Sequence, residues 1–166
     1  MRLSTALLAL LPLLATACGG SSDPSELTSN AQKALSRGEY DTAKADFDAA
    51  LAEIGEDANH SDYLRAKMGA IEARTQDEPA AAVSMFLALA KKVPDKVDAA
   101  DFSRIGGRLG DGGHFDEAIS LASAGMEQYP DSEFLTSLVQ KLGDMAKSSG
   151  KSDALKALAG LGYVGD

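Results

Sequence analysis

The sequence predicts an all-α fold of stacked antiparallel helix pairs, and three observations favour it. Only 5% of the 166 residues are aromatic and tryptophan is absent, whereas alanine is abundant, and small apolar side chains suit closely packed helices better than sheets. An 18-residue pattern occurs three times, each copy ending in a glycine or proline that stops a helix. The copies start 39 and 36 residues apart, a period typical of helical repeat arrays.

The first 17 residues are predicted to be a signal peptide outside the fold. Arg2 precedes an apolar run of 12 residues, 3–14, which is shorter than the roughly 20 residues that span a bilayer. Small residues then lead to Cys18, the only cysteine, whose thiol has no partner for an internal disulfide. This segment resembles the lipobox of bacterial lipoproteins, with Ala15 where that family usually has leucine. The resemblance implies cleavage before Cys18 and a covalent lipid on Cys18; the alternative is an ordinary secretory signal.

A lipid on Cys18 implies a location in the cell envelope. Two or more acyl chains hold a protein stably on a membrane without a transmembrane helix. In lipoproteins of this kind an aspartate after the cysteine often marks inner-membrane retention, and Gly19 stands there instead. The resemblance therefore implies an outer-membrane protein that faces the periplasm. Residues 18–23 are interpreted as a flexible tether that keeps the domain close to the membrane.

The charge of the chain bears on two classes of partner. Without Arg2, the mature chain has 15 basic and 25 acidic side chains. Nucleic-acid binding usually needs the opposite sign, and a basic patch for lipid headgroups is also missing. We therefore expect no nucleic-acid partner, and association with the membrane only through the lipid anchor.

The three copies of the pattern cover 38–55, 77–94 and 113–130, and alanine is the sixth residue of each. Together with the helix before each copy, they resemble the tetratricopeptide repeat, a pair of antiparallel helices about 34 residues long. The resemblance implies a right-handed solenoid with three repeats over 24–130; the alternative is an ordinary helix bundle. Small residues are needed where helices cross closely. They occupy the packing positions of the family at Ala31, Ala43, Ala70, Ala82, Gly106 and Ala118.

Caps and stops predict helices over 24–37, 40–54, 60–75, 78–92, 96–110 and 114–129. The expected N-caps are Asp23, Asn59, Asp95 and Asp131, and Pro24 takes the first position of its helix. Residues 131–166 lose the pattern and are interpreted as a degenerate fourth repeat whose helices cap the array. A short helix is expected over 152–160, with the tail folded back through Leu158, Leu161, Tyr163 and Val164.

The resemblance also implies a concave groove, lined by the first helix of each pair, that binds a protein or peptide segment. Counting positions within the repeat gives the candidate groove residues Leu64, Lys67, Ile71, Arg74, Ser103 and Gly107, flanked by Ser25, Thr28, Gln32, Leu35, Ala100 and Gly110. Lys67 and Arg74 are two cations on an otherwise acidic protein and would meet a carboxylate or an acidic segment. The alternative is that both are ordinary solvated charges.

The sequence offers little for catalysis. His114 has carboxylates nearby in the sequence, but it lies in the turn of a repeat, where polar residues are common, so we expect no metal site. The glycines of 106–113 neither follow a strand nor contain a phosphate-binding motif. Gly107 and Gly110, for which the sequence gives no packing role, predict that helix 96–110 is the least stable. We expect no enzyme, no cofactor beyond the lipid and no small-molecule substrate.

These features predict a lipid-anchored adaptor or scaffold of the cell envelope that binds a protein partner, in envelope assembly, secretion or pilus assembly. The prediction rests on the anchor and on analogy with the fold, which indicate binding without naming the partner. The first alternative is a structural subunit of an envelope complex, with the exposed ends of the array as interfaces. The second is an enzyme or enzyme accessory, for which the sequence offers no residue set.

Overall fold

The computed structural model describes residues 23–163, and within this range the chain is helical, with no β-strand. Eight α-helices and one 3-10 helix follow one another within these residues: α1 Pro24–Ser36, α2 Tyr40–Ile54, α3 Tyr63–Arg74, α4 Pro79–Lys92, η1 Pro94–Lys96, α5 Ala99–Asp111, α6 Phe115–Gln128, α7 Glu133–Ser148 and α8 Ser152–Ala159. The all-α prediction is confirmed. The predicted signal peptide, Cys18 and Val164 lie outside the described residues.

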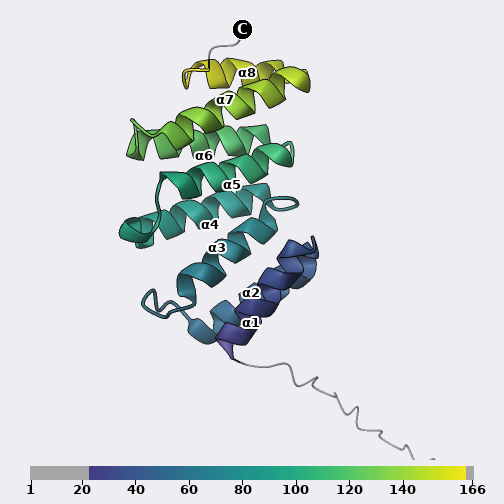
Figure 1. The fold of residues 1–166 in the computed structure, drawn as a ribbon, viewed down its shortest axis with the longest axis vertical. Coiled ribbons are helices and arrows are strands. Elements are labelled where there is room, and N and C mark those ends of the chain that lie inside the picture. The colour runs from purple at the N-terminus through teal and green to yellow at the C-terminus, as the bar shows by residue number, and fades with distance from the viewer. Residues whose placement is uncertain (1–22, 164–166) are drawn as a thin grey trace, which may run out of the picture.

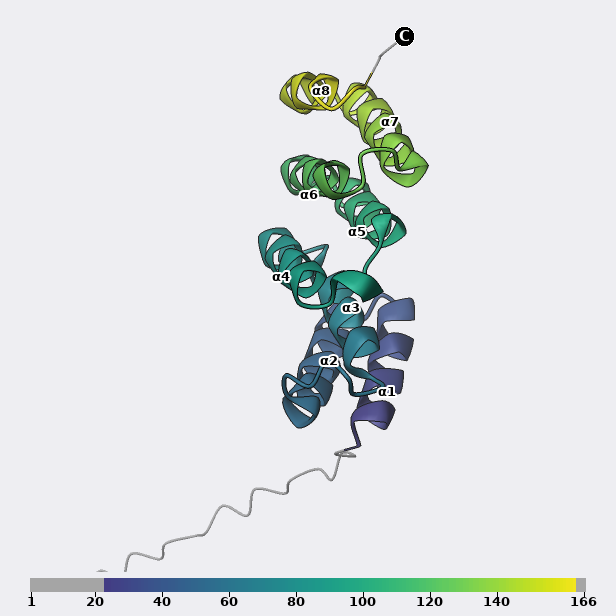
Figure 2. The same cartoon turned by 90° about the vertical axis from the view of Figure 1, so that its left-hand side faces the viewer.

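The helices are stacked along the long axis of the molecule, from α1 at one end to α8 at the other (Figure 1). Seen from the side, the stack has two rows: α1, α3, α5 and α7 form one, and α2, α4, α6 and α8 form the other (Figure 2). Each odd-numbered helix packs against the even-numbered helix that follows it. A surface of one row is therefore built from segments that are far apart in the sequence.

Glycine closes most of the tight connections from an odd helix to the next even helix. Gly38 and Gly113 have positive φ angles of 74° and 80°, a conformation that other residues rarely adopt. This explains the glycine at the start of the first and third copies of the sequence pattern. In the second copy Asp77 takes that place, and the connection from α3 to α4, 75–78, is one residue longer than the others.

The core between the rows combines small residues with phenylalanines. The six small residues expected at helix crossings are all buried: Ala31, Ala43, Ala70, Ala82, Gly106 and Ala118. The ring of Phe47 fills the space beside Gly69, where an added Cβ would lie 2.1 Å from the ring. Phe86 and Phe102 meet edge to face, with 4.8 Å between ring centroids, an arrangement that aromatic pairs favour. Small residues and rings together let neighbouring helices approach closely.

One predicted N-cap is confirmed and three are displaced. Asp23 caps α1 as predicted, accepting a hydrogen bond from the backbone N–H of Ser25 over 3.0 Å. Asn59 does not cap α3, which begins at Tyr63. The backbone N–H of Asn59 instead donates to the side chain of Asp57, because the chain makes a turn before the helix starts.

The cap of α5 lies three residues after the predicted one. Asp95 lies inside η1, and Asp98 caps α5 by accepting hydrogen bonds from two backbone N–H groups of the first turn, at 2.9 and 3.1 Å. The side chain of Asp101 accepts from the N–H of Asp98, which completes a capping box. At α7 the cap position is Ser132 and not Asp131.

The junction between α1–α4 and α5–α8 is the least closely packed one along the stack. The backbone of α5 runs along α6 and α7 but not along α4, the α-helix before it in the sequence. Side chains bridge this junction: Phe86 meets Phe102, and the hydroxyl of Tyr129 donates to the carbonyl of Val97 over 2.8 Å. Charged side chains of the odd-numbered row also meet here, as described below.

Helices α7 and α8 close the C-terminal end of the stack. Leu158 of α8 is fully buried. The ring of Tyr163 lies against Gly143 of α7, where any side chain on the glycine would collide with it, so the tail folds back as predicted up to the last described residue. Among residues 23–163, no helix is both long enough and apolar enough to cross a bilayer.

Candidate functional site

The six candidate groove residues do not share one surface. Ile71 is fully buried, and Leu64 is partly buried against the core. Lys67 lies beside Tyr63, with its Nζ 5.8 Å from the ring centroid and 3.8 Å from the Glu56 carboxylate. The prediction that these three residues of α3 line one groove is therefore wrong, because they do not face a common open surface.

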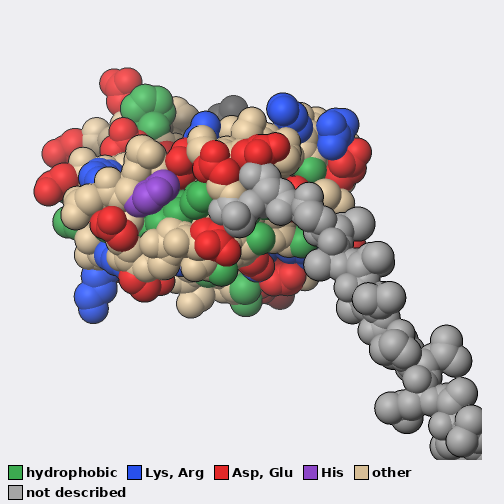
Figure 3. Space-filling model, turned by 90° about the horizontal axis from the view of Figure 1, so that it is seen from below, with side chains coloured by type: hydrophobic (Ala, Val, Ile, Leu, Met, Phe, Trp, Pro, Cys, Tyr) green, Lys and Arg blue, Asp and Glu red, His purple; other side chains and the backbone are tan. Residues whose placement is uncertain are grey.

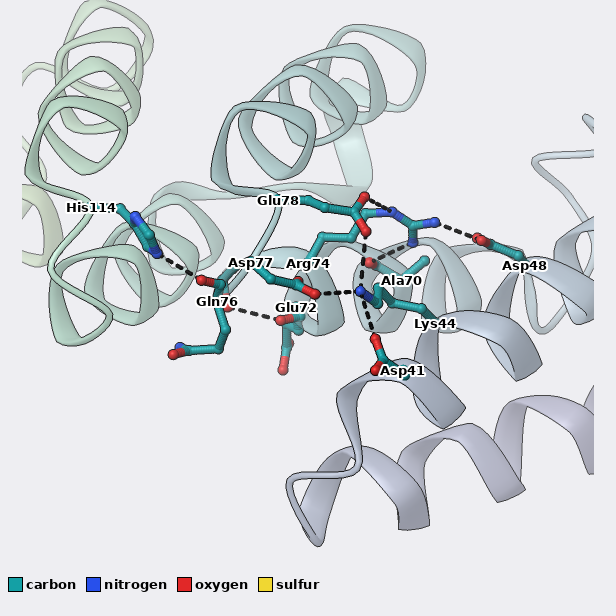
Figure 4. A network of polar contacts seen from close by, with 11 residues as sticks. Asp41, Lys44, Asp48, Ala70, Glu72, Arg74, Gln76, Asp77, Glu78 and His114 are labelled. Atoms are coloured by element: carbon teal, nitrogen blue, oxygen red, sulfur yellow. Dashed lines mark hydrogen bonds and ion pairs between the residues drawn. The ribbon is translucent and has the colours of Figure 1, made fainter.

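Arg74, the fourth predicted residue of α3, belongs to an ion-pair network (Figure 4). Its guanidinium pairs with Asp48 of α2 at 2.6 Å and with Glu78 before α4 at 3.3 Å, and only 13% of its side chain is exposed. Lys44 of α2 reaches the same segment through Asp77 and Glu78. The hydrogen bond to Asp77 is the main cause that raises the pKa of Lys44, and the same bond lowers the pKa of Asp77. Arg74 therefore joins α2, α3 and α4.

The open face of α3 is offset by one residue from the predicted face. The α3 residues that line a surface hollow include Arg65, Met68 and Glu72, each one position after a predicted residue. One residue turns the direction of a helical side chain by about 100°. The same offset occurs on α5, where Arg104 and Arg108 line the groove one position after Ser103 and Gly107, so the groove face lies about one residue beyond the positions that the resemblance implies.

Two adjoining hollows form a groove along the odd-numbered row of helices. Arg104 and Arg108 of α5 line both hollows and so lie at its centre. We call this surface the odd-row groove. It is lined by Gln32, Leu35, Ser36, Arg65, Met68, Gly69, Glu72, Ser103, Arg104, Gly107, Arg108, Asp111, Ser137, Leu138 and Lys141. Ser103 and Gly107 of the predicted set belong to it, as do Gln32 and Leu35 of the flanking set.

Arg104 and Arg108 converge on the carboxylate of Glu72, across the junction between α3 and α5. Arg108 Nη2 lies 2.9 Å from Glu72 Oε2, and Arg104 pairs with the other carboxylate oxygen. The side chain of Glu72 is 12% exposed, whereas those of Arg104 and Arg108 are 40% and 43% exposed. Two guanidinium groups therefore share one largely buried carboxylate and remain open to solvent.

Arg104 keeps its charge at neutral pH. Burial lowers the pKa of Arg104, and the charge of Arg108 lowers it further, but the guanidinium group of arginine stays protonated in proteins. Asp101 makes a further ion pair with Arg104 at 3.0 Å. Burial raises the pKa of Asp101, although a backbone hydrogen bond from Asp98 opposes the rise. The centre of the groove is therefore cationic, with carboxylates placed beside the guanidinium groups.

Helix α7 carries an exposed aromatic residue about one turn before the residues that line the groove. Phe134 is 61% exposed, and its carbonyl accepts a hydrogen bond from Ser103 Oγ over 3.1 Å. Lys141, two turns further on the same face of α7, pairs with Asp111 of α5 at 2.8 Å. The space above Gly107 in the odd-row groove is open. A Cβ added to this glycine would have one neighbour within 4 Å, the Nζ of Lys141 at 3.8 Å.

Two other sequence features have structural causes. Gly110 does have a packing role, because an added Cβ would lie 2.4 Å from Leu142 Cδ2. His114 donates from Nε2 to the carbonyl of Gln76 over 2.8 Å and so ties the α5–α6 turn to the α3–α4 turn (Figure 4). Within the described part of the chain, no group of three or more metal-binding side chains is placed to hold a metal ion.

The cations of the groove contrast with the charge of the whole chain. The chain has 25 acidic and 16 basic side chains, and acidic side chains are spread over the surface seen from the α1–α2 end (Figure 3). Four cations line the groove with two carboxylates: Arg65, Arg104, Arg108 and Lys141 with Glu72 and Asp111. Asp62 and Asp101 pair with Arg65 and Arg104 from beside the lining. The excess of cations is therefore confined to the lining residues, where it attracts anionic groups at short range.

Sequence reasoning missed the centre of the groove. The spacing of Arg104 and Arg108 could have indicated them, because residues four apart share one face of a helix and Gly107 lies between them in the sequence. No signal in the sequence pairs Glu72 with them, since Glu72 lies on another helix and the groove face of that helix was predicted one residue too early.

Comparisons of the chain with protein-family models, with curated proteins and with solved structures gave no match. The assignment of a function therefore rests on the sequence and on the geometry of the odd-row groove.

Proposed function

We propose that this chain is a lipid-anchored adaptor or scaffold of the cell envelope that binds a protein partner along the odd-row groove. The observation that carries the proposal is the groove itself, an open surface across α1, α3, α5 and α7 with an excess of cations on an acidic chain. Such a surface offers contacts to an extended segment, whereas small molecules bind in enclosed pockets. The adaptor would act in envelope assembly, secretion or pilus assembly.

We propose further that the stack is a tetratricopeptide-like, right-handed solenoid, with three repeats over 24–130 and a degenerate fourth repeat over 131–166. The threefold pattern of the sequence supports this assignment, and so do the two rows of helices (Figure 2). The same place of the pattern is buried in each copy, at Ala43, Ala82 and Ala118. An ordinary bundle requires no such recurrence.

The anchor is proposed from the sequence. Cys18 precedes Asp23, the cap of α1, by five residues, so a lipid on Cys18 would tether the α1 end of the stack to the membrane, on the periplasmic side of the outer membrane. Cys18→Ala is expected to release the protein into the soluble fraction or to leave the signal peptide uncleaved, with Ser21→Ala as the matched control. Continued sedimentation of the Cys18→Ala protein with membranes at high salt would contradict the anchor.

The partner can be sought by photo-crosslinking in intact cells. A photoreactive residue at Ser137, an exposed position of the groove, is expected to give one dominant adduct with a foreign protein. The control probe is placed at Ala80, which is exposed on α4 in the other row. Self-adducts alone would favour a structural subunit of an oligomeric complex. Adducts that match those of the control probe would mean that the groove is not the working surface.

A further inference from the structure

The arginine pair at the centre of the odd-row groove indicates the chemistry of the partner. We propose that Arg104 and Arg108 bind a carboxylate of an acidic partner segment, and that Glu72 is an internal carboxylate that competes for the same donors. The inference rests on the proposed binding function of the groove, and it adds the kind of segment that the groove accepts.

The pair is arranged for carboxylates. Arg104 and Arg108 lie about one turn apart on α5, so both guanidinium groups project from one face of the helix. Both reach the carboxylate of Glu72 on the neighbouring helix α3. A guanidinium presents a planar fork of N–H donors that matches the two oxygens of a carboxylate. Glu72 therefore shows the mode of binding that a partner carboxylate would use.

Glu72 does not use the full capacity of the pair. Each guanidinium has five N–H donors, and among the described residues Arg108 has Glu72 as its one ion-pair partner. The two arginine side chains are 40% and 43% exposed where they line the groove, while Glu72 is 12% exposed. A carboxylate that arrives from solvent would therefore meet free donors before it meets Glu72.

Apolar side chains flank this charged centre on both sides. Leu35 and Met68 line the groove on α1 and α3. Leu138 lines it on α7, and the exposed Phe134 lies about one turn before Leu138 on that helix. Apolar contacts around a charged pair exclude water and strengthen binding. The segment that complements the groove thus has acidic residues in its middle and apolar residues at both ends.

A long polyanion complements the molecule less well. The chain has a net charge of −9, and acidic side chains are spread over the α1–α2 end of the stack (Figure 3). A polyanion that extends beyond the groove would be repelled by that surface. A short acidic peptide meets only the groove and its two partly exposed arginines, so the observations favour a peptide.

The inference is tested on the full-length protein, purified in detergent, with a fluorescein-labelled peptide Leu-Ser-Glu-Asp-Glu-Ser-Leu. Fluorescence anisotropy is expected to show binding that is lost when Gln and Asn replace the acidic residues. Arg104→Gln combined with Arg108→Gln is expected to weaken binding about tenfold or more. The matched control, Arg37→Gln with Lys156→Gln, removes the same charge from exposed ion pairs outside the groove and should change the affinity less than about twofold.

Glu72→Gln is expected to act in the opposite direction. The substitution removes the competing carboxylate but keeps the size of the side chain, so the peptide should bind about threefold tighter or more. If circular dichroism shows that the arginine variant is unfolded, the inference is tested by Glu72→Gln alone. Unchanged or weaker binding by the folded Glu72→Gln protein would overturn the inference, and so would a wild-type protein that does not bind the peptide.

Three further outcomes distinguish this inference from general attraction of polyanions and from the proposed adaptor function. Heparin that competes as well as the unlabelled peptide, together with equal losses in the groove variant and the control variant, would indicate general attraction of polyanions and overturn the inference. Failure of peptide binding while the Ser137 probe still captures one foreign protein would refute the acidic chemistry and leave the adaptor standing. A third outcome is that the peptide binds specifically while photo-crosslinking in cells gives only self-adducts. This result would support the arginine site and contradict the adaptor.

Discussion

Helix α5 is joined to α7 mainly by apolar packing on one side, with an ion pair and a hydrogen bond at the edge, and to α3 by charges on the other. Toward α7, the bare backbone at Gly106 and Gly110 receives the side chains of Leu138 and Leu142. An added Cβ at the two glycines would lie 2.7 and 2.4 Å from these leucines, so the helices approach as closely as their backbones allow. Well-packed apolar contacts of this kind leave no room for water or a ligand between the glycines and the leucines.

Toward α3, the same helix makes contact through Arg104, Arg108 and Glu72. The guanidinium groups remain partly exposed, and ion pairs at the surface contribute little stability. The two junctions therefore differ in what they contribute. The glycine side fixes α5 on α7, and the arginine side leaves guanidinium groups partly exposed at the surface.

The largest effect is expected where the apolar junction is overfilled. Gly106→Leu forces a side chain into the space that Leu138 occupies and should lower the free energy of unfolding by about 3 kcal/mol. Urea denaturation followed by circular dichroism measures the change. Gly107→Leu, one residue further along, faces the open groove and serves as the control. Equal losses in the free energy of unfolding would contradict the contrast between the packed junction and the open groove.

A slightly smaller effect is expected at the crossing of α5 and α6. Ala118 is fully buried, and Ala118→Leu should overpack the crossing and destabilise the fold by about 2 kcal/mol. Thermal melting compares this variant with Ser120→Leu, which changes an exposed position of the same helix. An unchanged melting curve for Ala118→Leu would mean that the repeat register is misplaced.

The charged junction should contribute less than the apolar one. Glu72→Gln leaves Arg104 and Arg108 without their shared carboxylate and is expected to cost about 1 kcal/mol of stability, because the arginines are partly exposed. The difference from wild type should shrink in about 0.5 M salt, which screens the pairs. If urea denaturation shows that Glu72→Gln lowers the free energy of unfolding as much as Gly106→Leu does, the two junctions contribute equally to stability.

The smallest effect is expected to have the opposite sign. Gly107→Ala adds a Cβ that meets no atom closer than 3.8 Å and improves helix propensity, so it should stabilise the fold by about 0.5–1 kcal/mol. Gly110→Ala should lack this gain because its Cβ would collide with Leu142. Equal stabilities of the two variants in urea would show that space beside the helix does not distinguish these glycines.

The sequence predicted helices best where both ends carry a local signal. Helix α2 is predicted at 40–54 and found at Tyr40–Ile54, between Gly38 and Gly55, which both have positive φ angles. The start of α3 is misplaced because the turn before it depends on hydrogen bonds among its own polar residues, such as the one from Asn59 to Asp57. Patterns of hydrophobic residues do not report such turns.

The candidate site could be predicted only in part. Ser103 and Gly107 line the groove, whereas Lys67 and Ile71, the equivalent positions of α3, lie beside Tyr63 and in the core. The meeting of Glu72 with Arg104 depends on how two helices lie next to each other. A single sequence carries periodicity within one helix, but it does not carry the relative rotation of two helices.

The arrangement in rows also bears on how the chain folds. Each substantial backbone contact between described helices joins helices that are at most two places apart in the chain. Contacts of short sequence separation favour fast folding, so α1, α2 and α3 can pack before α8 has been synthesised. We expect hydrogen exchange to show opening that starts at an end of the stack and stays local. A lesion at one end would then leave distant helices folded, and denaturation would pass through partly folded species.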